Sequence, residues 1–147
     1  VRSRPFSFCP RAVTAPADPA PAADLDPADP AIAATRHWVE RAVIGLNLCP
    51  FAKAVQIGGR VRYRVSRATT IDALLADLGV ELQHLAAVDA EVVDTTLLIH
   101  PQVLTDFLDY NDFLDVADAA VEALKLEELL QVASFHPQYQ FADTEPD

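Results

Sequence analysis

The chain has 147 residues, of which 51% are hydrophobic, and a formal net charge of −11. This length suits one domain, and no apolar run approaches the roughly 18 residues that a membrane span requires. The acidic balance argues against nucleic acid as a partner, because its binders neutralise phosphates with Lys and Arg. Cys9 and Cys49 have neither zinc-site nor redox spacing, so we expect reduced thiols in a cytoplasmic protein.

The charges are distributed unevenly along the chain. Residues 31–67 hold seven basic residues and one acid, whereas residues 68–147 hold one base and seventeen acids. Complementary packing of the two halves is the favoured interpretation. A local basic patch that binds an anionic small molecule is the alternative.

Residues 1–30 are predicted to be a disordered tail, and residues 31–147 a single domain. The tail holds seven of the eleven prolines, many alanines and no periodic apolar face. The chain begins with Val1 rather than Met. A targeting peptide, upstream sequence translated in error and a cloning remnant are three origins for the tail, and the absence of an apolar signal core favours the last two.

The first helix is predicted to begin at the Asp-Pro step of residues 29–30, because Asp is a good N-cap and Pro is favoured at the first helical position. We expect it to end by Leu48, since Pro50 disfavours helical angles at the preceding residue. After a Gly-Gly turn, Val and Tyr alternate with Arg over residues 60–65. This alternation predicts a half-buried strand with one basic face.

Thr69 or Thr70 is expected to cap a second helix with a leucine-rich face, and residues 95–99 to form a buried strand. In the third helix, Tyr110, Phe113, Leu114, Ala117, Val121 and Leu124 are predicted to face inward and Asp112, Asp115, Asp118 and Glu122 outward. Residues 130–135 are predicted to be a third strand. The order α-β-α-β-α-β predicts an α/β fold with a small, mostly parallel three-stranded sheet packed with about three helices.

Four stretches resemble one known family, the domain of unknown function 1415. They are WVERAVIGLNLCPFAK (38–53), TTLLIHP (95–101), DFLDYNDFLD (106–115) and ASFHPQYQF (133–141). The resemblance covers the chain from about Trp38 onward and implies no particular chemistry. Members usually continue with a glycine-containing turn and a further polar segment. Asp143 stands where that glycine is expected, so the resemblance implies a form truncated at the C-terminus.

Two His-Pro steps, at His100-Pro101 and His136-Pro137, each end a predicted strand. If those strands are parallel, both imidazoles lie at the carboxyl edge of the sheet, where open α/β sheets bind ligands. Histidine there can act as a general acid, a general base or a metal ligand. The alternative is that each His-Pro is a polar strand stop, and the pairing makes the two interpretations about equal.

Acidic residues begin the third helix at Asp106 and Asp109, which are predicted to turn toward its apolar face. Acids there complement the helix dipole, which is a sufficient reason for their presence. Asp109 is also a candidate to orient a catalytic histidine. Asp106 with His100 and His136 would resemble a two-histidine, one-carboxylate set, so a divalent metal is a candidate cofactor.

Cys49 is a candidate nucleophile, although a small buried apolar residue is the favoured interpretation. Arg62 and Arg64 are candidates to bind an anion, but basic strand residues opposite acidic helices usually form ion pairs. Asn111 and Tyr139 are further candidate substrate contacts.

These patterns favour an enzyme that acts on a small, anionic molecule through His100 and His136. The alternative is a non-catalytic binding or regulatory domain that presents the acidic face of its third helix to a basic protein partner. The third hypothesis is that the chain is a truncated relative without activity.

Overall fold

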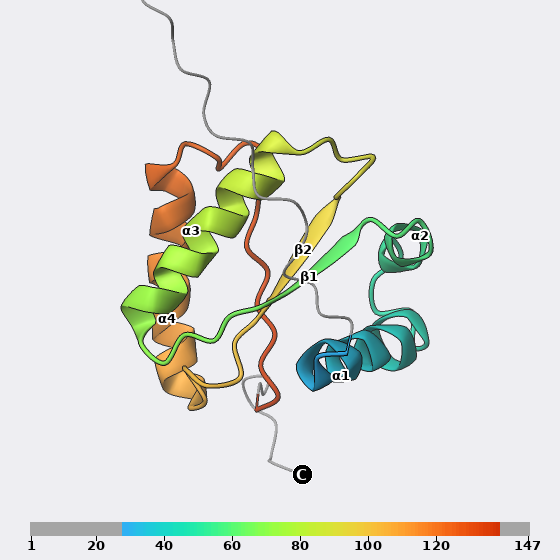
Figure 1. Ribbon diagram of the computed structural model, residues 1–147, viewed down its shortest axis with the longest axis horizontal. Coiled ribbons are helices and arrows are strands. Elements are labelled where there is room, and N and C mark those ends of the chain that lie inside the picture. The colour runs from blue at the N-terminus through green and yellow to red at the C-terminus, as the bar shows by residue number, and fades with distance from the viewer. Residues whose placement is uncertain (1–27, 139–147) are drawn as a thin grey trace, which may run out of the picture.

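The computed structural model describes residues 28–138, and the predicted tail up to residue 27 lies outside that range. Its elements in chain order are α1 (Pro30–Trp38), the π-helical η1 (Val39–Ile44), α2 (Ala52–Ile57), β1 (Val61–Val65), α3 (Ile71–Ala87), β2 (Thr95–Ile99) and α4 (Phe107–Ala123). The α/β class is confirmed, and α1, α3 and α4 lie where three helices were predicted, whereas α2 was not predicted (Figure 1). None of the described helices is long and apolar enough to cross a membrane.

Side chains at the helix starts determine where the helices begin. Asp29 accepts a hydrogen bond from the amide of Ala31 at 2.8 Å, and Thr70 accepts one from that of Ala73 at 3.3 Å. Both N-caps satisfy amides that have no partner within the helix. The first helix changes to π-helical hydrogen bonding at Val39, so the predicted single helix to Leu48 is wrong in its second half. Asn47, at φ 54°, turns the chain away after η1.

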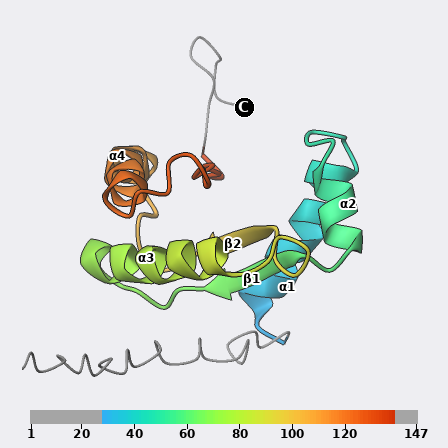
Figure 2. The ribbon, with the colours of Figure 1, turned by 90° about the horizontal axis from the view of Figure 1, so that it is seen from above.

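The sheet of the described chain has two strands, not the predicted three. β1 and β2 pair in parallel, with Val61 opposite Thr95 and Val65 opposite Ile99. Residues 131–136 have no regular secondary structure, and no backbone hydrogen bond joins them to β2. In Figure 1 they nevertheless run in the same direction as the strands, and in Figure 2 they lie on the β2 side of the sheet at the level of α4.

Successive side chains of β1 point to opposite faces of the sheet. Tyr63 points toward α1 and α2: its hydroxyl donates to Gln56 at 2.8 Å, and the Arg36 guanidinium lies 4.9 Å from its ring centroid. Arg62 points the other way, toward Glu81 of α3. β1 is therefore covered by α1 and α2 on one face and by α3 on the other.

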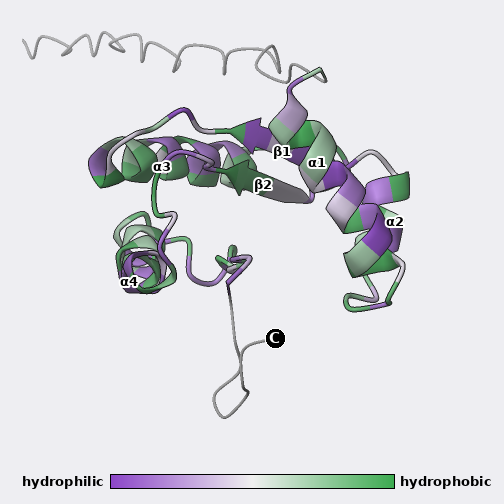
Figure 3. Cartoon of the chain, turned by 90° about the horizontal axis from the view of Figure 1, so that it is seen from below, coloured by the Kyte–Doolittle hydropathy of each residue, from purple (hydrophilic) through white to green (hydrophobic). Residues whose placement is uncertain are grey.

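The main core lies between α3, α4 and β2. Its buried residues are Ala68, Leu74, Val103, Leu104, Tyr110, Phe113 and Ala117, with Leu98 packed against them. Four of the residues predicted to face inward on α4 are buried, and all four predicted outward acids are exposed. In Figure 3 the Leu and Ile half of β2 is hydrophobic, which fits a strand at the edge of this core.

A buried ion pair joins β1 to α3. Arg62 donates to both carboxylate oxygens of Glu81, at 2.8 and 3.1 Å, and Arg64 lies 3.6 Å from the same carboxylate. Glu81 is only 5% exposed. The basic strand β1 and the acidic helix α3 therefore meet in a buried, bidentate ion pair.

We predict that Glu81→Leu lowers the free energy of unfolding by about 3–5 kcal/mol, because it removes the carboxylate that two guanidinium groups contact inside the protein. Urea unfolding followed by circular dichroism measures this. Glu81→Leu combined with Arg62→Met should recover most of the loss, while the exposed Asp118→Asn should change stability by less than about 0.5 kcal/mol. A Glu81→Leu variant as stable as the control would contradict the prediction.

Candidate functional site

One large cavity lies between β2, α3, α4 and residues 130–137, which we call the 130–137 segment. Its volume is about 1050 Å³, and consecutive residues from Thr96 to Pro101 line one wall, with the 130–137 segment lining another. The remaining walls are leucines of α3 and the inward face of α4, together with Thr35 and Trp38 of α1. The size is that of a ligand site, and most of the lining is apolar.

His100 lines this cavity and lies directly after β2. Its Nδ1 is 3.0 Å from the carbonyl oxygen of Val103. A carbonyl oxygen only accepts hydrogen bonds, so Nδ1 carries a proton and donates it. In the neutral ring Nε2 therefore has the lone pair, and this nitrogen is able to accept a proton.

His136 has the opposite arrangement. The backbone amide of Gln138 donates to its Nδ1 at 3.2 Å, so this nitrogen holds the lone pair. The proton of the neutral ring is then on Nε2, which is a hydrogen-bond donor. The two histidines are thus held in different tautomers by neighbouring backbone groups.

Both imidazoles pack against Tyr110 of α4. Its ring centroid is 5.8 Å from that of His100, nearly parallel at 20°, and 5.0 Å from that of His136 at 32°. The Tyr110 hydroxyl accepts a hydrogen bond from the amide of Phe135 at 3.0 Å. Burial raises the pKa of Tyr110 above 10.0. It is therefore a neutral phenol near physiological pH, and it ties the 130–137 segment to α4.

The sequence pattern predicts that Tyr110 lies in the core and assigns it no part in this site. The available signal was a tyrosine on the inward face of a helix, since a buried tyrosine hydroxyl usually needs a polar partner. The partner itself lies 25 residues along the chain. Only the folded structure shows that it is the backbone of Phe135.

The acids at the start of α4 do not join the histidines. Asp106 is the exposed N-cap of α4 and accepts from the amides of Leu108 and Asp109, at 2.8 and 3.3 Å. Asp109 and Asn111 are also exposed, so the predicted inward orientation of Asp106 and Asp109 is wrong. Within residues 28–138 no three His, Cys, Asp or Glu side chains form a group that could hold a metal ion. The predicted set of His100, His136 and Asp106 is therefore not assembled, because Asp106 is used as a cap.

The remaining candidates lie elsewhere. Cys49 is half-buried in the turn between η1 and α2 and does not line the cavity. Arg62 and Arg64 contact Glu81 and are not in the cavity lining either. Tyr139 lies outside the described residues, so its role as a substrate contact stays a prediction.

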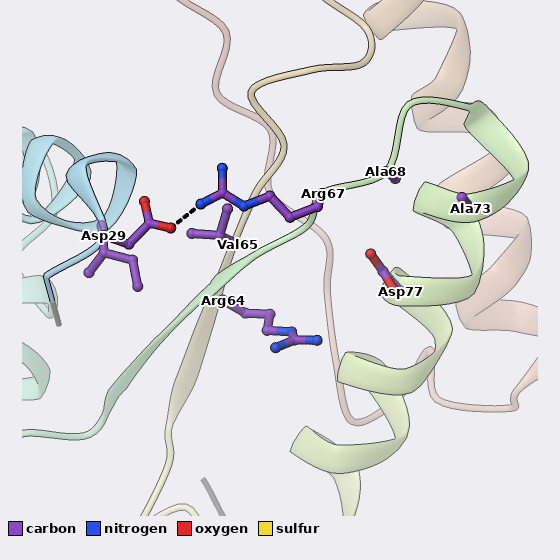
Figure 4. Close-up of a pocket in the computed structure, with 8 residues that line it drawn as sticks. Asp29, Arg64, Val65, Arg67, Ala68, Ala73 and Asp77 are labelled. Atoms are coloured by element: carbon purple, nitrogen blue, oxygen red, sulfur yellow. Dashed lines mark hydrogen bonds and ion pairs between the residues drawn. The ribbon is translucent and has the colours of Figure 1, made fainter. Parts of the chain in front are cut away.

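A second, smaller hollow of about 490 Å³ lies beside the end of β1 (Figure 4). Arg64 reaches toward it, but its acids already have partners. Asp29 forms an ion pair with Arg67, and Asp77 accepts from the Ser66 hydroxyl at 2.6 Å. The larger cavity with its two histidines is the better candidate site.

Comparison with known proteins agrees with the resemblance noted in the sequence. Residues 30–147 match the family described as "Protein of unknown function (DUF1415)". The chain belongs to this family. No curated protein and no solved structure matches the chain. Membership confirms the predicted resemblance, and any function has to be argued from the site itself.

We predict that neutral His100 is protonated on Nδ1 and neutral His136 on Nε2, because the Val103 carbonyl and the Gln138 amide select these tautomers. Long-range nitrogen–proton correlation spectra above neutral pH distinguish the two forms. The exposed His37 provides an internal reference for an unconstrained ring. Identical tautomer populations at all three rings would contradict the assignment.

We predict that Tyr110→Phe has two effects. At neutral pH the loss of the bond to Phe135 should cost about 0.5–1.5 kcal/mol and speed hydrogen exchange at the Phe135 amide. Burial raises the pKa of Tyr110 in the folded state. The contribution of Tyr110 to the free energy of unfolding is therefore fully present below pH 10.0 and is lost as the pH rises past this value. The variant should therefore lose less stability than the wild type above that pH in urea unfolding. Tyr63→Phe, on the other face of the sheet, should leave Phe135 exchange unchanged.

Proposed function

We propose that the protein is an acid–base enzyme that hydrolyses a small acyl compound bound in the large cavity. The observation that carries this proposal is the pair of histidines in opposite tautomers around one tyrosine ring. One imidazole offers a lone pair and the other offers an N–H, and both line the same mostly apolar cavity. A base and a hydrogen-bond donor in one cavity are the two groups that attack on a carbonyl requires.

In this mechanism Nε2 of His100 accepts a proton from a water molecule as its oxygen attacks the acyl carbon. The charged ring keeps its Nδ1–H bond to Val103, so the backbone carbonyl stabilises the positive charge. The carbonyl π electrons move to the acyl oxygen, and Nε2–H of His136 donates to it while remaining neutral. When the bond to the leaving group breaks, His100 returns its proton to that group and the carboxylic acid is released.

The charge of the cavity bears on the substrate. The cavity lining contains no Lys or Arg, and its carboxylate, Glu81, is paired with Arg62. Arg62 and Arg64, the cations expected to bind an anionic substrate, contact Glu81 instead. The preference for an anionic substrate therefore remains a prediction. The residues present also do not fit a divalent metal, because His136 Nδ1 and Asp106 both accept from backbone amides. The proposed hydrolysis requires neither an anionic substrate nor a metal ion.

A binding domain that uses its acidic helix face is the second candidate. The favouring observation is a row of exposed acids on α4 at Asp112, Asp115, Asp118 and Glu122. Such a domain needs no histidines in the cavity, and the packing of both imidazoles on Tyr110 favours the enzyme.

We predict that His100→Ala lowers saturable hydrolysis of p-nitrophenyl butyrate by about 100-fold or more, because the base is removed. His136→Ala should lower kcat with less effect on KM, since its donor acts on the charge that develops during the reaction. Release of p-nitrophenol measures both. His37→Ala, on the exposed surface of α1, is the matched control.

The double variant His100→Ala/His136→Ala should unfold near the temperature of the wild type, which separates a chemical role from a structural one. If the wild type hydrolyses this ester no faster than His100→Ala does, the proposal is overturned. A binding domain would show that result.

A further inference from the structure

The outer edge of β2 faces the large cavity. The Ser66 amide donates to the Ile99 carbonyl at 2.7 Å, so Ile99 directs its backbone groups toward β1. Backbone groups alternate between the two sides of a strand. Those of Thr96 and Leu98 therefore point to the other side, into the space that residues 96–101 line.

The opposite wall of this space is held away from β2. The amide of Phe135 is bonded to the Tyr110 hydroxyl, and its ring packs edge-on against Trp38 at 5.2 Å. These contacts tie the 130–137 segment to α4 and α1. Figures 1 and 2 show it running along β2 in the same direction, and no backbone hydrogen bond links residues 131–136 to the strand.

We infer that the cavity takes a short extended peptide, which adds a strand to the sheet along the outer edge of β2. The peptide is the substrate class of the proposed enzyme, and only its turnover rests on that proposed function. Because His100 follows β2 directly, one end of a strand bound there lies beside the histidines.

Main-chain chemistry favours a peptide over a purely apolar chain. An apolar chain laid on β2 would remove water from the N–H and C=O groups of Thr96 and Leu98 and leave them without partners, which is costly. A peptide in β conformation offers matching groups at the spacing of the strand. Thr96 Oγ1 is a further polar atom in this lining that is buried without a hydrogen-bond partner in the described structure.

The side walls define the side chains that such a peptide would carry. Leu78 and Leu82 of α3 line one side of the cavity, and Trp38 of α1 lines another. A strand covered on both faces reads as apolar at successive positions. The five residues of β2 at about 3.3 Å each span roughly 16 Å, which accommodates about five peptide residues.

The test uses a capped peptide of five valines flanked by single lysines, with Trp38, the only tryptophan of the chain, as the fluorescent reporter. The peptide should shift Trp38 emission saturably. N-methylation of alternate amides should weaken binding by about tenfold in the register that faces β2. Dodecanoate is the comparison ligand. The inference is overturned if dodecanoate binds and the peptide does not, or if neither N-methylated register weakens binding.

A matched pair of protein variants tests the same edge. Thr96→Pro removes an N–H that points away from β1, so the sheet keeps its internal bonds, and peptide affinity should fall by about tenfold. Thr96→Val retains that N–H and removes only the Oγ1 hydroxyl, so it should lose less affinity than Thr96→Pro. The N-methylated peptides decide the question if Thr96→Pro does not fold. Slow hydrogen exchange at Thr96 and Leu98 in the free protein would overturn the inference, because the 130–137 segment would then already occupy the edge.

The two proposals fail separately. Peptide binding is read from Trp38 emission and turnover from release of p-nitrophenol, so each is measured without the other. Peptide binding without ester hydrolysis would leave this inference standing and remove the enzyme. Hydrolysis of p-nitrophenyl butyrate without peptide binding would leave the enzyme standing and remove the peptide site.

Discussion

The Tyr110 side chain is the contact on which the candidate site depends. Its ring packs in the main core and lies against both imidazoles, and its hydroxyl holds the backbone of Phe135. The same residue therefore stabilises α4, positions two histidines and sets the distance of the 130–137 segment from β2. A phenol suits this position because it combines a large apolar ring with one polar atom at its end.

A second constraint comes from the uneven charge of the chain. The basic strand β1 and the acidic helix α3 meet at Glu81, which two arginines contact. Burial makes this pairing costly to break from one side, so it aligns α3 with the sheet. Since α3 supplies the leucines of the cavity, the ion pair also shapes the proposed peptide site, and it keeps Arg62 and Arg64 from acting on a substrate.

Much of the local structure could be predicted from short-range patterns. The caps at Asp29 and Thr70, the basic and apolar alternation of β1 and the inward face of α4 all depend on neighbouring residues. The prediction of a third strand over residues 130–135 was wrong. Its apolar residues fit a strand, but strand formation needs a partner edge, and Phe135 is bonded to α4 and packed on α1 instead. Asp106 was misplaced because a capping role and an inward role share the same sequence signal.

The sequence by itself determined α1, α3 and α4, the parallel direction of two strands and the family, because each follows from local periodicity or from motif residues in order. It also singled out the two His-Pro steps. Only the tertiary structure decided that both imidazoles contact Tyr110, that their tautomers differ and that the outer edge of β2 opens on a cavity. Those features depend on hydrogen bonds and packing between segments distant in the chain, which no local pattern encodes.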